Sequence, residues 1–318
     1  MSYQVWNRGT RALAALLLAA ACGRSQEVAR PASGKTFSSP EEAGAAVLAA
    51  AQSGNPEAMI AIFGPGSKAV LFSGDADTDK ARLDNFVTAY HQMHRWGTVK
   101  AGGEVLLVGY DNHPFPIPLG KSISGRWYFD TAAGKDEILA RRIGKNELTA
   151  MDAMQALGEA ERQYFHQAHE GSKQYAQTFA SGPGRQNGLY WAAADGQTPS
   201  PLGRFGDFAK DLASSNAGSS TEFNGYCYRI LSKAKTPRGV EDFVVDGKMT
   251  GGFAILAYPT EYRSSGVMSF LIGRDGTVYQ KDLGERTADM GANMTIYNPR
   301  DGWTPVGASI ARALPRRP

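Results

Sequence analysis

Helical patterns dominate the first part of the chain after residue 36. Ser39 can cap a helix whose first position suits Pro40, and Gly54 marks its end. A second helix is predicted from Asn55 to Phe63, because asparagine is a good helix cap and a Gly-Pro-Gly turn follows. A third is predicted over about 81–95, where apolar residues keep the spacing of one buried helix face.

Strand patterns follow these helices. Residues 104–110 and 125–130 are rich in Val, Leu and aromatic side chains and are bounded by glycines. Between them, alternating prolines over 113–118 favour an extended edge segment over a central strand. Helices before strands predict a domain over residues 36–144 in which helices pack on a curved antiparallel sheet. This order resembles the cone-shaped domains of the nuclear-transport-factor-two-like type, a likeness of fold that implies no function.

The second half begins with a long predicted helix, which Asn146 can cap and which runs from 147 to about 169. A stretch rich in Gly and Pro follows, and strands then return in series, separated by Asp-Gly signals that favour tight hairpins. The predicted strands are 226–231, 243–246, 253–258, 267–272 and 277–281. We therefore expect an α+β protein whose second domain, residues 145–318, is a long helix packed on an antiparallel sheet.

The N-terminus has the pattern of an export signal over residues 1–21. Arg8 and Arg11 precede an apolar run over 12–21 that is too short to span a bilayer. Cys22 follows directly, and the sequence Leu-Ala-Ala-Ala before it resembles the lipobox at which bacterial lipoproteins are cleaved and diacylated. We expect a periplasmic lipoprotein held to a membrane through Cys22, with the polar residues 22–35 as a tether. Because Ala19 stands where leucine is usual, cleavage to a soluble periplasmic protein is the alternative.

Charge and composition exclude several classes of protein. The chain has 34 Lys and Arg against 31 Asp and Glu, without a long basic run, so nucleic-acid binding has no electrostatic basis. Its 42% hydrophobic content is enough for a buried core. Two cysteines cannot form a disulfide framework, and we expect Cys227 to behave as a small buried hydrophobe. The sequence has no nucleophile elbow and no P-loop, so we expect no cofactor and favour a non-enzymatic protein.

Histidine spacing raises a metal-binding hypothesis. His91 and His94, and likewise His166 and His169, are three residues apart in predicted helices, so each pair can share a helix face. Neither pair belongs to a His-Glu-x-x-His motif. We therefore favour ordinary helix-face histidines, and metal scavenging would need the two pairs to converge in space.

Several segments spread along the chain resemble one bacterial family. They are residues 36–43 (TFSSPEEA), 113–118 (HPFPIP), 127–134 (WYFDTAAG), 141–147 (RRIGKNE), 188–191 (GLYW), 251–253 (GGF) and 258–262 (YPTEY) through Asp275-Gly276. Together they look like the bacterial envelope family catalogued as domain of unknown function 2950, and they cover nearly the whole mature chain. The resemblance implies an exported, often lipid-anchored protein and brings no activity with it.

The second half is also weakly similar to the globular heads of type IV pilins and pseudopilins, in which a long helix precedes an antiparallel sheet. The chain departs from the pilin pattern because its long hydrophobic segment is the predicted signal peptide, far from the predicted long helix. Joining a pilus through the usual membrane helix is therefore not expected.

Two functional hypotheses follow. The leading one is an accessory or interaction module of the cell envelope, anchored at Cys22 and binding an envelope protein partner. The alternative is a periplasmic small-molecule-binding or hydrolytic domain that uses a cavity in the N-terminal half, lined by Tyr90, His94, Tyr110 and Trp127. A deep pocket would favour the alternative, and a filled domain interior would favour the first.

Overall fold

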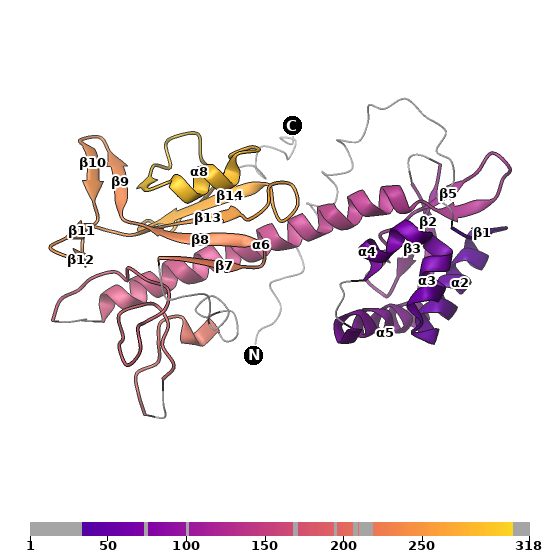
Figure 1. The fold of residues 1–318 in the computed structure, drawn as a ribbon, viewed down its shortest axis with the longest axis horizontal. Helices are drawn as coiled ribbons and strands as arrows, with labels where there is room; N and C mark the ends of the chain where they lie inside the picture. Colours follow the sequence, from indigo (N-terminus) through magenta and orange to yellow (C-terminus); the bar gives the residue numbers. More distant parts are fainter. Residues whose placement is uncertain are drawn as a thin grey trace, which may run out of the picture. The chain divides into compact units, whose positions relative to one another are not determined.

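The structure, a computed structural model, describes residues 34–72, 76–99, 102–167, 171–193, 196–205, 209 and 219–307. The chain folds into two compact units that meet between Ile138 and Leu139. Figure 1 shows helices and strands in both units, and their order confirms the predicted α+β class. Cys22 and the predicted signal peptide lie outside the described residues.

The helices of the first unit include the three predicted ones, although the third begins at Ala76 and not at about residue 81. They are α2 (Pro40–Ser53), α3 (Pro56–Phe63), α4 (Lys68–Leu71) and α5 (Ala76–Gln92), with a short 3₁₀ turn at Pro65–Ser67. The Ser39 hydroxyl accepts a hydrogen bond from the Glu42 N–H, and Gly54 ends α2 in the left-handed conformation with φ 63°. α5 ends before the predicted residue 95, because the chain enters a strand at His94.

The first unit contains a six-stranded antiparallel sheet. Its strands are β1 (Thr36–Phe37), β2 (His94–Thr98), β3 (Glu104–Val108), β4 (His113–Pro114), β5 (Leu119–Lys121) and β6 (Trp127–Phe129). Their order is β1-β6-β5-β3-β2, and the short strand β4 pairs with β3. The proline-rich segment therefore supplies a two-residue edge strand, as its missing N–H donors predict.

The helix α6 (Thr131–His166) is 36 residues long and begins well before the predicted residue 147. The Asp130 carboxylate accepts a hydrogen bond from the Ala133 N–H at 3.0 Å and so caps the new start. Gly134 is needed in the first turn, because a Cβ there would lie 2.6 Å from the Ile117 side chain. The division between the units falls inside this helix, whereas the predicted boundary was at 144/145.

The sheet of the second unit is antiparallel and has the order β17-β15-β14-β13-β8-β7. Its strands are β7 (Ser220–Phe223), β8 (Tyr226–Leu231), β13 (Ala254–Pro259), β14 (Met268–Gly273), β15 (Val278–Asp282) and β17 (Thr304–Pro305). Every residue of β13 is buried, because hydrophobic clusters cover both faces of the sheet. α6 packs on one face, and the short helix α8 (Thr287–Asn293) lies against β13.

Smaller strands surround this sheet. β9 (Lys233–Thr236) pairs with β10 (Gly239–Asp242) and, in parallel, with β16 (Ile296–Tyr297). A separate hairpin joins β11 (Val244–Val245) to β12 (Lys248–Met249), and Gly203–Phe205 forms a 3₁₀ turn. The sequence pattern does not predict the short strands β7, β9, β10, β12, β16 and β17.

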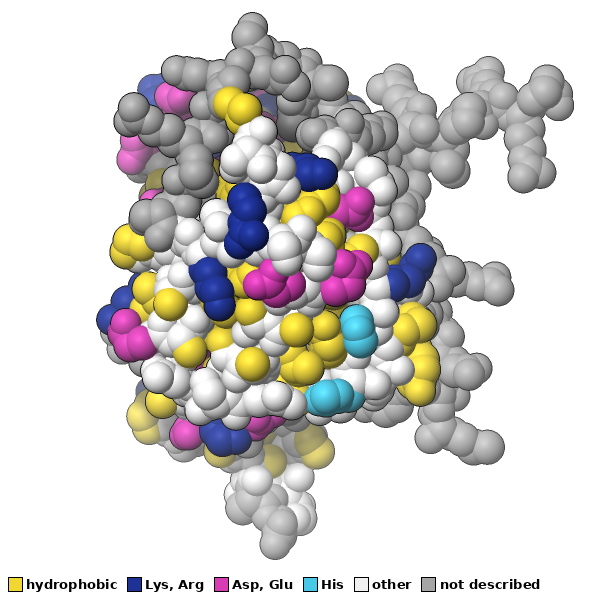
Figure 2. Space-filling view, turned by 90° about the vertical axis from the view of Figure 1, so that its right-hand side faces the viewer, with side chains coloured by type: hydrophobic (Ala, Val, Ile, Leu, Met, Phe, Trp, Pro, Cys, Tyr) yellow, Lys and Arg dark blue, Asp and Glu magenta, His cyan; other side chains and the backbone are white. Residues whose placement is uncertain are grey.

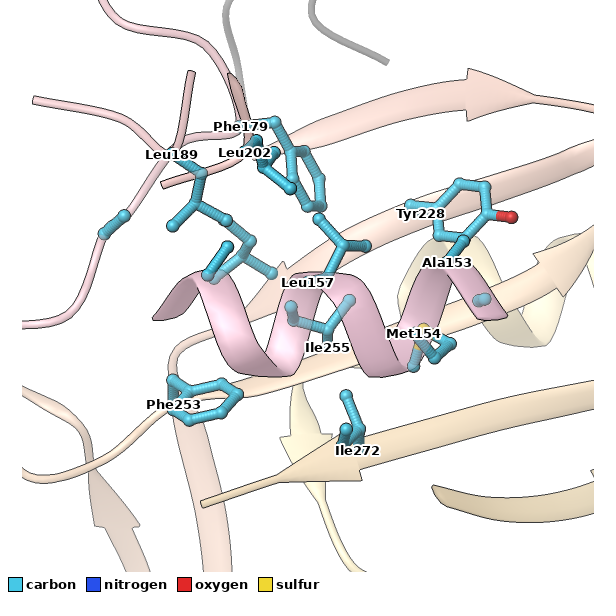
Figure 3. Close-up of a cluster of buried hydrophobic side chains, with 14 of the residues drawn as sticks. Ala153, Met154, Leu157, Phe179, Leu189, Leu202, Tyr228, Phe253, Ile255 and Ile272 are labelled. Carbon is cyan, nitrogen blue, oxygen red and sulfur yellow. The ribbon is translucent and has the colours of Figure 1, made fainter. Parts of the chain in front are cut away.

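The core of the second unit lies between α6 and the main sheet. Figure 3 shows Ala153, Met154 and Leu157 of α6 among side chains of the sheet and of the segment that follows the helix. The labelled partners are Phe179, Leu189, Leu202, Tyr228, Phe253, Ile255 and Ile272. Gly158 allows the close approach, since a Cβ there would lie 2.6 Å from Ile272 Cδ1.

Candidate functional site

The predicted pocket residues of the first unit fall into separate environments. Tyr90 is buried at the end of α5 and stacks on His94, with ring centroids 4.0 Å apart. Tyr110 is 75% exposed in the turn after β3. Trp127 is half-buried on β6, where its ring lies 5.1 Å from the Lys121 ammonium group. Tyr90 packs with Leu106, whereas Trp127 packs against the cluster of another part of the sheet. The structure thus brings Tyr90 and His94 together and places Tyr110 and Trp127 elsewhere.

Phenylalanine side chains fill the space between the helices and the sheet of the first unit. Phe63 of α3 lies 4.7 Å from Phe129 of β6 and 5.9 Å from Phe115, measured between ring centroids. Phe37 contacts Phe129 at 6.2 Å, and Phe86 of α5 contacts Phe115 at 5.5 Å. Of the proposed pocket residues, Trp127 packs against this cluster, whereas Tyr90 belongs to a separate one.

His91 and His94 do not share a helix face, and the second histidine pair is only partly described. His94 lies on β2, so it does not share a helix face with His91, and its Nδ1 is 3.1 Å from the Tyr90 carbonyl oxygen. His91 Nε2 is 3.2 Å from the Gln52 amide nitrogen. His166 is exposed in the last turn of α6, and His169 lies outside the described residues. Figure 2 shows two histidines at the surface of one face, beside hydrophobic and acidic side chains.

Metal ligands are not gathered in the part of the chain that the structure describes. No three His, Cys, Asp or Glu side chains of these residues are placed to hold an ion together. Cys227, on β8, is half-buried, and its thiol donates a hydrogen bond to Glu222 Oε1 at 3.4 Å. Burial raises the pKa of this thiol, and a hydrogen bond with Tyr258 offsets part of the shift. These surroundings make Cys227 a poor nucleophile.

A buried carboxyl group is the most unusual polar feature of the described residues. Glu161 lies in α6 and is fully buried. Its Oε2 atom accepts a hydrogen bond from the Ala176 N–H at 2.9 Å, and its Oε1 atom has no hydrogen-bond partner among the atoms that the structure places. Burial raises the pKa of Glu161 well above its ordinary value, and the Ala176 hydrogen bond lowers it by less. The site can therefore hold a proton that an exposed glutamate would release.

Aromatic residues border this carboxyl group. Tyr175, next to Ala176, stacks on Phe165 with ring centroids 4.5 Å apart and contacts Phe253 at 5.0 Å. Burial raises the pKa of the Tyr175 hydroxyl, while the charges of Arg274 and Arg162 lower it. The arrangement attaches the segment after α6 to the helix through one buried acid and a stack of rings.

The burial of Glu161 can be predicted from its spacing in the sequence of α6. The buried stripe of α6 runs through Ala150, Ala153, Met154, Leu157, Ala160 and Tyr164. Glu161 is four residues after Leu157 and three before Tyr164, so helical geometry puts it on that stripe. A carboxyl group on a buried stripe is rare and indicates a structural or functional role.

A second polar contact fastens α6 to the beginning of β14. Glu147 Oε1 accepts hydrogen bonds from the N–H groups of Val267 and Met268, each at 2.9 Å. One turn of the helix also supplies Asn146, whose amide donates to the Ser265 carbonyl oxygen at 2.9 Å. Asn146 and Glu147 belong to the RRIGKNE segment (141–147), and their partners lie in the run that begins at YPTEY and ends at Asp275-Gly276. Two segments that are distant in the sequence therefore meet in one structural contact.

The fold and these contacts define an α+β protein of two compact units, in which separate polar contacts join a long helix to the start of a strand and to the segment that follows the helix. Residues 34–306 match the family described as a protein of unknown function (DUF2950), and the chain belongs to that family. No curated protein and no solved structure matches the chain. The similarity to pilin heads therefore stays a prediction. No helix of the described segments combines the length and apolar character of a membrane span.

Proposed function

We propose that this protein is an exported module of the bacterial envelope, anchored to a membrane by lipid on Cys22 and acting through protein interaction rather than catalysis. The order of the sequence supports export, because an apolar run over 12–21 precedes Cys22 and a polar segment separates Cys22 from β1. Two acyl chains at Cys22 would hold the folded units firmly at a membrane surface.

The phenylalanine network of the first unit is the observation that carries the choice of a module over an enzyme. Phe63, Phe115 and Phe129 contact one another between the helices and the sheet, and Phe37 contacts Phe129. Small-molecule sites are concave and mostly apolar, with a few convergent polar groups. The ring contacts favour a structural core, and they weaken the support for a small-molecule or hydrolytic site.

Intact mass spectrometry tests the anchor. The natural full chain is purified from the membrane fraction of its own cells, beside a Cys22→Ser variant. We expect a mature chain that begins at Cys22 and carries diacylglyceryl and acyl mass, and we expect the variant to lose that mass and leave the membrane fraction.

An unmodified chain cut near residue 21 and found in the soluble fraction would overturn the anchored part of the proposal. The module hypothesis has its own test, chemical cross-linking in intact cells followed by identification of the linked proteins. Specific envelope proteins linked to surface lysines of the chain are the expected result, and linkage only to abundant bystanders, at the level of an unrelated periplasmic control, would contradict it.

A further inference from the structure

We infer that the β5–β6 hairpin and the adjoining strand β1 form a contact surface for an anionic phospholipid bilayer. The surface consists of Ile123, Lys121, Arg126, Trp127 and Lys35, and it is called the hairpin surface below. The inference rests on the proposed function, because it gives the anchored protein a defined side toward the membrane.

The hairpin holds an isoleucine in the solvent. Ile123 is 90% exposed at the tip of the turn between Lys121 and Arg126. Backbone hydrogen bonds fix this turn, from the Ser122 N–H to the Arg126 carbonyl at 2.8 Å and from the Gly125 N–H to the Ser122 carbonyl at 2.9 Å. The Ser122 hydroxyl also accepts from the Arg126 N–H at 3.0 Å. Because the turn is ordered, the apolar side chain is presented in a fixed position.

Cations flank this apolar tip. Residues 119–129 contain Lys121 and Arg126 and no acidic residue, and both cations are exposed. The Lys121 ammonium group lies over the Trp127 ring, and the Lys35 ammonium group lies 5.6 Å from the Phe37 ring. Arg126 donates to the Thr36 carbonyl oxygen at 3.0 Å, which joins the hairpin to β1. The arrangement keeps three positive charges and the rim of a tryptophan at one edge of the sheet.

The Glu42 carboxylate lies within reach of these charges. Glu42 at the start of α2 accepts a hydrogen bond from the Ser38 N–H at 2.7 Å, and the charges of Arg126 and Lys35 act on it. This hydrogen bond holds the Glu42 carboxylate at the N-terminus of α2. This carboxylate offsets part of the positive charge of the hairpin surface.

A bilayer surface matches this combination of groups. Anionic headgroups attract lysine and arginine, an exposed apolar tip can enter the boundary with the acyl chains, and tryptophan favours the same interface. Residues 23–35 are 13 in number, so they allow at most about 45 Å between a lipidated Cys22 and β1. Such a tether keeps the hairpin surface at a high effective concentration near the membrane, and a weak contact is therefore sufficient to orient the unit.

Vesicle co-sedimentation tests the surface with the full mature chain carrying Cys22→Ser, so that binding does not depend on lipid. Vesicles of phosphatidylcholine with phosphatidylglycerol are compared with vesicles of phosphatidylcholine alone. We expect binding to the anionic vesicles that weakens with salt. The double variant Lys121→Gln, Arg126→Gln is expected to lower the partition coefficient about 30-fold, since each cation near an anionic surface contributes about fivefold.

A matched control separates the hairpin surface from net charge. Lys80→Gln with Arg82→Gln removes two exposed cations of α5, which packs against α2, β2 and β3. The strand β2 lies at the opposite end of the sheet order from β1. We expect this control to bind nearly as the parent does, and Ile123→Ser to bind more weakly than the parent at unchanged charge. Circular dichroism of all variants checks that these exposed substitutions leave the fold intact.

The outcomes distinguish this inference from the proposed function. Equal losses in the hairpin variant and the α5 control would overturn the inference, because binding would then follow charge alone. Absence of binding to anionic vesicles would also overturn it and would redirect the search toward a protein that covers the hairpin. The mass of the natural chain is an independent measurement. The lipid anchor can therefore be confirmed when the vesicle experiment contradicts the hairpin surface, and the hairpin surface can be confirmed when the mass contradicts the anchor.

Discussion

Replacing Glu161 by glutamine is expected to change how the stability of the second unit depends on pH. Burial raises the pKa of Glu161 above its ordinary value of 4.5. The folded unit therefore binds the proton more tightly than the unfolded chain does. Its contribution to stability is fully present below about pH 4.5 and is lost as the pH rises toward the folded-state pKa. Glu161→Gln removes this titration and leaves an amide oxygen to accept from the Ala176 N–H.

The magnitude follows from linkage of one proton. The free energy of unfolding of the natural chain can fall by at most about 1.4 kcal/mol for each pH unit within that window. The loss begins near pH 4.5, where the unfolded chain releases the proton, and it continues for as long as the folded unit keeps the proton on Glu161. The variant, measured against the natural chain, should therefore gain stability progressively from acidic to neutral pH.

Urea unfolding at several pH values between about 5 and 8 measures this difference. Hydrogen exchange of peptides from α6 and β13 reports the second unit, which separates its unfolding from that of the first. Burial also raises the pKa of Asp152, but that group is present in both chains and cancels in the difference. Glu285→Gln, at an exposed position of the same unit, is the matched control. Stability differences for Glu161→Gln that stay constant over the whole range would refute the reasoning.

Three further predictions concern packing and chemistry. Gly144→Ala should stabilise the protein by about 0.5–1 kcal/mol in thermal unfolding, since a Cβ there meets open space. Gly158→Ala should destabilise it by about 1–2 kcal/mol, because the added Cβ would press against the buried side chain of Ile272. A reversed order would contradict the packing of α6. Glu147→Ala should cost about 2–3 kcal/mol in urea unfolding, because two N–H groups at the start of β14 lose a charged acceptor. Cys227 should react with iodoacetamide at pH 8 many times more slowly than in the urea-unfolded chain, because burial raises its pKa; equal rates would show that the thiol is accessible.

Local chemistry allowed much of the fold to be predicted. Ser39, Pro40 and Gly54 act through side-chain or backbone preferences that need no distant partner, so α2 has its predicted bounds. The buried strands β8, β13 and β14 were found because short apolar runs between turn signals have few alternatives. The predicted start of α6 at residue 147 is wrong. Gly134 and Gly144 lower the helix propensity of the preceding residues, but the packing of Gly134 on Ile117 outweighs that cost.

Tertiary structure decided the features on which function would depend. His94 lies on β2 and not in the predicted helix, because β2 pairs with β3. No sequence pattern around residues 91–94 indicates that pairing. The spacing of Glu161 puts it on the buried stripe of α6, but its burial and its bond to Ala176 depend on a segment that folds back after the helix ends. Periodicity identifies which face of an element is buried, since it arises within a few residues. The environment of a single polar group depends on distant segments, and only the folded chain brings those segments together.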